Sequence, residues 1–138
     1  MAWSTEVNGP VAIEVYPAAT LIAHGFRSGG YKRQEQIAER REILACLGRL
    51  IEVGPHVSEL ERSADALDAA VCVLAAQDFL EGRAMAPLNL DLATQEGWIW
   101  AAARTSIGQG GAVETCDVPE AGRPWLPGRA PALGLEPD

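Results

Sequence analysis

Apolar and polar residues along the first part of the chain predict a β-strand followed directly by a helix. In residues 11–16, VAIEVY, β-branched apolar residues alternate with other residues, and Glu14 is the one charged residue. Residues 17–25, PAATLIAHG, begin with a proline, which suits the first turn of a helix, and end with a glycine, which suits its termination. A strand followed by a helix is typical of an α/β fold.

Three later segments also have a recognisable pattern. Residues 33–50 place apolar residues at helical spacing with charges opposite, which predicts an amphipathic helix. Residues 63–76, SADALDAAVCVLAA, are apolar on nearly every side, as expected of a buried helix. Either Ser58, in the capping-box pattern SELE, or Ser63 caps a helix here. Residues 96–103, EGWIWAAA, favour one more strand or a docking segment.

These patterns predict one domain over residues 11–103. From residue 104 onward the chain is rich in glycine and proline and has no periodicity, which predicts an extended or partly disordered tail over residues 104–138. Trp125 is the residue through which we expect the tail to lie against the domain. A chain of 138 residues with 48% apolar and 22% charged residues is suited to one globular core.

The net charge of −8 means that binding to nucleic acid requires a local basic patch. Five of the eleven basic residues lie in residues 26–41, FRSGGYKRQEQIAERR. Lys32 and Arg33 follow a glycine-rich loop, where side chains and backbone donors can converge on a phosphate. Arg40 and Arg41 alternate with glutamates, which favours a solvated helix face for both.

The cysteines, the histidine His24 and the apolar stretches give few further indications of function. Three cysteines without metal-like spacing predict a reducing, cytoplasmic location, and Cys72 is expected to be a structural thiol. His24 is expected to complement the dipole at the C-terminal end of its helix. The sequence has neither a signal-peptide pattern nor an apolar stretch of membrane-spanning length, so we expect no contact with membranes.

Three carboxylates are the main candidates for function. Asp65 and Asp68 are three residues apart, so both project from one side of the helix near its first turn. Acidic residues in that position also complement the positive end of the helix dipole without any chemistry. However, two aspartates on a buried helix and Glu14 in an apolar strand need a compensating partner or cation, and among cations oxygen ligands suit Mg²⁺ or Mn²⁺.

The order EVYPAA, GYKRQ, DALDAAVCVLAA and EGWIW resembles the second half of the domain-of-unknown-function family 429, whose members are described as predicted nucleases of the RNase H-like fold. DALDAA also resembles the acidic last helix of RuvC-type junction resolvases. The resemblance extends from Val11 to Trp100. It implies an α/β, RNase H-like domain reduced to its C-terminal half, with mostly helices and few strands.

The resemblance also implies a function, that of a two-metal phosphodiester hydrolase acting on nucleic acid. Glu14 would be the acidic residue on the fourth strand, and Asp65 and Asp68 would be the carboxylates of the terminal helix. Together they would bind Mg²⁺ or Mn²⁺, which activates water and stabilises the leaving oxygen. Lys32, with Arg33, would contact the phosphate.

The RNase H-like fold opens with a three-stranded meander, whose first strand carries an essential aspartate, and then a helix. Here only MAWSTEVNGP precedes the predicted strand, so we expect a C-terminal half without that aspartate. Two functions follow. The chain is either a metal-dependent nuclease-like domain or a non-catalytic half-domain whose exposed strand drives homo-oligomerisation or pairing with a chain that supplies the missing half.

Overall fold

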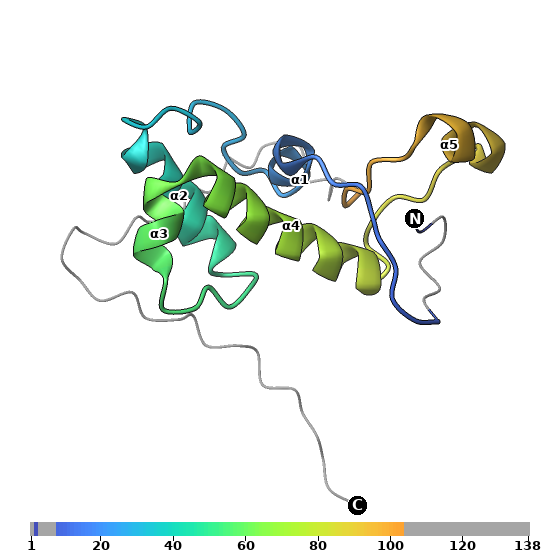
Figure 1. Ribbon diagram of the computed structural model, residues 1–138, viewed down its shortest axis with the longest axis horizontal. Coiled ribbons are helices and arrows are strands. Elements are labelled where there is room, and N and C mark those ends of the chain that lie inside the picture. Colours follow the sequence, from blue (N-terminus) through green and yellow to red (C-terminus); the bar gives the residue numbers. More distant parts are fainter. Residues whose placement is uncertain (1, 3–7, 104–138) are drawn as a thin grey trace, which may run out of the picture.

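The computed structural model of the chain describes residue 2 and residues 8–103, and the predicted tail with Trp125 lies outside them (Figure 1). The described residues form five helices: α1 (Pro17–Ala23), α2 (Ile37–Leu47), α3 (Val57–Arg62), α4 (Ala64–Leu80) and α5 (Leu90–Glu96). Helices α1 to α4 pack together, whereas α5 lies apart from them (Figure 1). None of the helices in the described part is long and apolar enough to cross a membrane.

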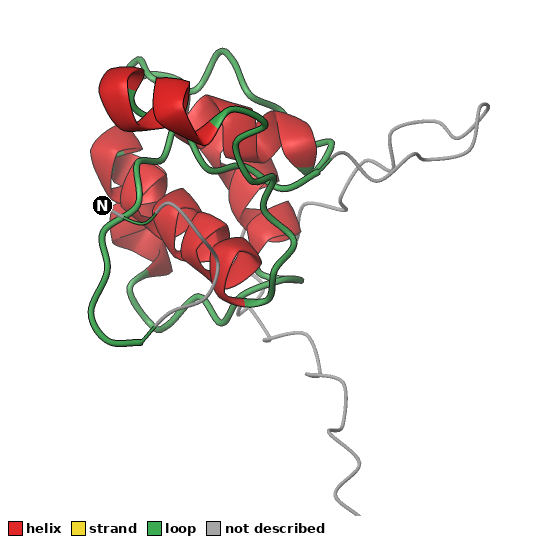
Figure 2. Ribbon diagram, turned by 90° about the vertical axis from the view of Figure 1, so that its right-hand side faces the viewer, coloured by secondary structure: helices red, strands yellow, loops and turns green. Residues whose placement is uncertain are grey.

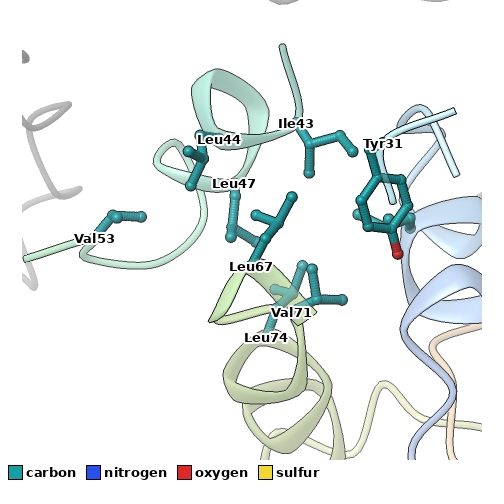
Figure 3. Packing of buried hydrophobic residues seen from close by; sticks show 9 residues of the cluster. Tyr31, Ile43, Leu44, Leu47, Val53, Leu67, Val71 and Leu74 are labelled. Carbon is teal, nitrogen blue, oxygen red and sulfur yellow. The ribbon is translucent and has the colours of Figure 1, made fainter. Parts of the chain in front are cut away.

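Helix α4 is the central element, since α1, α2 and α3 all pack against it. Its residues Leu67, Val71 and Leu74 follow one another at spacings of four and three and are fully buried. Figure 3 shows these side chains beside Ile43 and Leu47 of α2, with which they form the main core. The predicted buried helix is therefore confirmed, and it extends to residue 80.

The helix ends agree with several local sequence signals. The Ser63 side chain caps α4 by accepting a hydrogen bond from the backbone N–H of Ala66 at 3.2 Å. Helix α3 has no such cap, so the structure selects Ser63 over Ser58. Gly25, just after α1, has a φ of 72°, a conformation that glycine adopts without strain.

The predicted strand at residues 11–16 is extended but pairs only briefly. A single parallel bridge joins Glu14 to Ile99, and Figure 2 shows helices and loops without a strand in the described residues. Pro10 and Pro17 border the segment and lack the N–H group that a longer ladder requires. The pairing is thus limited to one residue, and the RNase H-like fold stays a prediction.

A second, smaller core lies at the C-terminal end of α4. The rings of Phe79 and Trp100 pack edge to face with centroids 4.8 Å apart. The Trp100 indole donates a hydrogen bond to the carbonyl of Ala2 at 3.2 Å, and the Trp98 indole donates one to the carbonyl of Met85 at 2.9 Å. The segment predicted as a strand or docking segment therefore docks onto α4 through its tryptophans.

Substitution of two valines of α4 tests the core. Val71 is fully buried and Val73 is 57% exposed, so Val→Ala changes helix propensity equally at the two positions but removes packed methyl groups only at the first. We expect Val71→Ala to lower the free energy of unfolding by roughly 2–3 kcal/mol. Val73→Ala should leave it within about 0.5 kcal/mol. Urea denaturation followed by circular dichroism measures both, and equal effects would contradict the assigned core.

Candidate functional site

Asp68, in the second turn of α4, is the centre of a polar cluster with Tyr31 and Lys32. The Tyr31 hydroxyl donates a hydrogen bond to Oδ1 of Asp68 at 2.8 Å, and the Lys32 ammonium forms an ion pair with Oδ2. The ammonium also lies 4.9 Å from the centroid of the Tyr31 ring. The structure thus brings together one residue predicted to bind metal and one predicted to bind phosphate.

The surroundings of Tyr31 and Lys32 in this cluster raise the pKa values of both residues. Burial, together with the hydrogen bond to Asp68, raises the pKa of the Tyr31 phenol. Burial alone would lower the pKa of Lys32, but the hydrogen bond to Asp68 and the charges of Tyr31 and Asp68 outweigh it and raise that pKa. One turn further along α4, burial and the Asp68 charge raise the pKa of Cys72, so the thiol is a poor nucleophile.

The loop before α2 is held by a guanidinium that is almost completely buried. Arg40 is 1% exposed. It donates hydrogen bonds to the carbonyls of Tyr31 at 2.6 Å, Arg33 at 2.7 Å, Gln34 at 3.0 Å and Glu61. The prediction of a solvated helix face is therefore wrong for Arg40, because these carbonyls supply the partners that a buried guanidinium needs.

The neighbouring residue Arg41 follows the prediction. It is exposed and forms an ion pair with the Glu61 carboxylate at 3.1 Å.

The loop held by Arg40 also explains the start of α2. The sequence predicted a helix from residue 33, but α2 begins at Ile37. The carbonyls of Arg33 and Gln34 accept hydrogen bonds from the guanidinium, and these residues do not continue the helix.

The three predicted metal ligands do not gather at one point. Asp65 is exposed in the first turn of α4. Glu14 is also exposed, and its Oε2 lies 3.1 Å from where a Cβ on Gly97 would be. Both oxygens of Asp68 already contact hydrogen-bond donors. In the described part of the chain no group of three or more His, Cys, Asp or Glu residues is placed to hold a metal ion, so this arrangement does not fit one.

Sequence reasoning missed the carboxylate of Asp78, which is fully buried near the end of α4. It accepts hydrogen bonds from His24 at 2.7 Å and from Nε of Arg83 at 2.9 Å. His24 lies at the C-terminal end of α1 as predicted, but its partner is this carboxylate. The available signal was that Asp78 is the one charged residue in residues 69–80.

These contacts define a small, mainly helical protein in which paired carboxylates of one central helix hold the surrounding segments. The family model described as Protein of unknown function (DUF429) matches residues 4–91, more than half of the chain, so the chain belongs to this family. The matched range includes Glu14, Lys32 and Asp68. Neither the curated proteins nor the solved structures contain a match.

Adjacent arginines test the role of the buried guanidinium. Arg40→Met removes the donor to four carbonyls, so we expect the free energy of unfolding to fall by roughly 3 kcal/mol or more. Arg41→Met removes one exposed ion pair and should change it by about 0.5 kcal/mol or less. Urea denaturation of both variants measures the difference, and similar losses would show that the carbonyls do not depend on Arg40.

The raised pKa values of Tyr31 and Lys32 predict a loss of stability at alkaline pH. Their ordinary values are 10.0 and 10.5, and the folded protein holds both protons more tightly than the unfolded chain does. The stabilisation is therefore complete below about pH 10 and is lost as the pH rises through the higher folded values. We expect the urea midpoint to fall above about pH 10 and to fall less steeply in Tyr31→Phe.

The control for this experiment is Tyr16→Phe, because Tyr16 is 56% exposed and the chain has two tyrosines. Absorbance at alkaline pH, recorded on Tyr16→Phe, follows the ionisation of Tyr31 alone. Lys32 is the single lysine of the chain, so its acylation, measured by mass spectrometry on the peptide that contains it and thus apart from the N-terminal amine, reports its own deprotonation. A Tyr31→Phe stability curve parallel to that of the unmodified protein would contradict the assignment.

Proposed function

We propose that this member of the family is a metal-dependent nuclease-like domain of the RNase H-like kind, which acts on nucleic-acid phosphodiesters. The observation that carries the proposal is the contact between Asp68 and Lys32. A carboxylate suitable for Mg²⁺ or Mn²⁺ lies beside a cation suitable for a phosphate, on a loop that Arg40 fixes. The resemblance of the ordered motifs to predicted nucleases supports it further.

In this proposal Lys32 and Arg33 bind the phosphate. Both are exposed, and the side chain of Lys32 is 56% accessible, so a phosphate can approach them without movement of the core. The loop backbone is held by the buried Arg40, which limits the conformational entropy that binding would cost.

The metal site of the proposal comprises Asp68 together with Glu14 and Asp65. These residues do not form a ligand group in the present arrangement, and Asp68 is engaged by Tyr31 and Lys32. The proposal therefore requires that these carboxylates rearrange around the ion and that Asp68 is released from Lys32.

The Lys32–Asp68 ion pair favours a second candidate function, that of a non-catalytic oligomerisation or interaction module. A carboxylate that a lysine already neutralises does not need a metal ion, and the cluster then serves to attach the loop to α4. In this case the exposed segment at residues 11–16 pairs with a second copy or with a partner chain.

Calorimetric titration with Mg²⁺ and Mn²⁺ tests the first candidate. We expect saturable binding that becomes at least about tenfold weaker, a change of about 1.4 kcal/mol, in Glu14→Gln and in Asp68→Asn. Asp91→Asn is the matched control, because Asp91 is an exposed aspartate in the first turn of α5. Cleavage of labelled DNA and RNA with Mn²⁺ should be lost in Asp68→Asn and retained in Asp91→Asn.

The absence of ion binding, or unchanged affinity in Asp68→Asn, would contradict the nuclease proposal. Light scattering after size-exclusion chromatography then tests the second candidate, which predicts a mass above that of one chain or a stable complex with a partner. A monomer that neither binds ions nor associates would contradict both candidates.

A further inference from the structure

Both oxygens of the Asp68 carboxylate are engaged, although the side chain reaches the surface. Oδ1 accepts the hydrogen bond of the Tyr31 hydroxyl at 2.8 Å, and Oδ2 forms the ion pair with Lys32. The Asp68 side chain is 21% accessible, so a ligand can approach it from solvent. The ion pair therefore occupies two groups at once, the carboxylate and the ammonium, each of which the proposed function assigns to a ligand.

The two donors to Asp68 differ in how easily they can leave it. Tyr31 is 1% exposed, and its carbonyl accepts a hydrogen bond from the buried Arg40 at 2.6 Å, so both its ring and its backbone are held. The Lys32 side chain is 56% accessible and has a flexible stem, and water solvates a separated ammonium well. A ligand can thus remove Lys32 from Asp68, whereas Tyr31 stays.

The surroundings of Lys32 favour the exchange of one acceptor for another. Its ammonium lies 4.9 Å from the centroid of the Tyr31 ring, whose face attracts a cation whether or not Asp68 is in contact. The next residue, Arg33, is exposed, and its backbone N–H donates a hydrogen bond to the Gln36 side chain at 2.9 Å, which fixes the loop at this point. A phosphate can accept from both cations, because it has several charged oxygens.

We propose that the Lys32–Asp68 ion pair is an autoinhibitory contact that a phosphate group of nucleic acid opens. The phosphate takes the Lys32 ammonium from Oδ2 of Asp68, and Tyr31 keeps the carboxylate in place with that oxygen free. Asp68 and the phosphate therefore compete for one cation. The inference rests on the proposed function for its ligand and identifies what releases Asp68. It involves only residues of this chain and requires no metal ion.

Binding of a fluorescently labelled oligothymidylate of about 12 nucleotides, measured by anisotropy in EDTA, tests the competition. Asp68→Asn keeps an oxygen that can accept from Tyr31 but removes the charge that holds Lys32. We expect this variant to bind the oligonucleotide at least about threefold more tightly at low salt. Asp91→Asn, which removes the same charge from exposed α5, should change the affinity less than about twofold.

A second variant separates the ion pair from a general effect of charge. Lys32→Gln should weaken binding at least about threefold, because it removes one phosphate contact. Asp68→Asn combined with Lys32→Gln should then bind within about twofold of Lys32→Gln alone, because the carboxylate acts through the lysine. Since Lys32 is exposed and asparagine can still accept from Tyr31, circular dichroism should show an unchanged fold.

The single lysine also gives a readout at the ion pair itself. In protein labelled with ¹³C at the lysine Cε, one methylene signal reports on Lys32. We expect this signal to shift during the oligonucleotide titration with the same midpoint as the anisotropy. A signal that does not move would overturn the inference.

The outcomes distinguish this inference from the proposed function. Unchanged or weaker binding in Asp68→Asn, together with weaker binding in Lys32→Gln, would overturn the inference and leave the proposed phosphate site intact. An equal gain from Asp68→Asn with and without Lys32 would also overturn it. Binding that does not depend on Lys32 would contradict both. If the coupling is observed but ion binding is absent, the inference stands and the metal-dependent proposal is wrong.

Discussion

The hydrogen bonds of the Arg40 guanidinium are the constraint on which the polar site depends. They join α2, which carries the arginine, to the carbonyls of the preceding loop and to the last turn of α3. A buried cation is tolerated here because carbonyl dipoles surround it. Since the carbonyl of Tyr31 is one of its acceptors, the same interaction positions the phenol and the adjacent Lys32 over Asp68. The site is thus a consequence of how this loop is folded.

Helix α4 shows a second physical rule. It is apolar on nearly every side, so hydrophobic burial alone specifies poorly which side faces which neighbour. Asp68 and Asp78 supply the missing specificity, because each must find its own partners. They are ten residues, or about 15 Å, apart along the helix. One binds the loop before α2, and the other binds the end of α1 through His24. Together they define the rotation and position of α4.

Features that depend on neighbouring residues could be predicted from the sequence, whereas contacts between distant residues could not. Helical periodicity and the proline and glycine signals predicted the positions of α1, α2 and α4 because these are properties of neighbouring residues. Arg40 and Arg41 have the same flanking pattern, yet one is buried and the other exposed. The difference comes from carbonyls of an aperiodic loop, which no spacing rule describes. The partners of Asp78 are equally distant, since His24 is 54 residues away. The pairing of Glu14 with Ile99 likewise depends on a contact between distant segments.

The Lys32–Asp68 contact is compatible with both candidate functions because its contribution to the free energy is small. An ion pair in which the lysine is mostly exposed contributes only about 0–1 kcal/mol, because water solvates the separated ammonium well. A phosphate that binds Lys32 competes with an interaction of that size and no larger. The hydrogen bond from Tyr31 differs, because the tyrosine is buried and its hydroxyl has fewer alternative partners. Tyr31 therefore holds the Asp68 carboxylate in place, while Lys32 is the group that a ligand can displace.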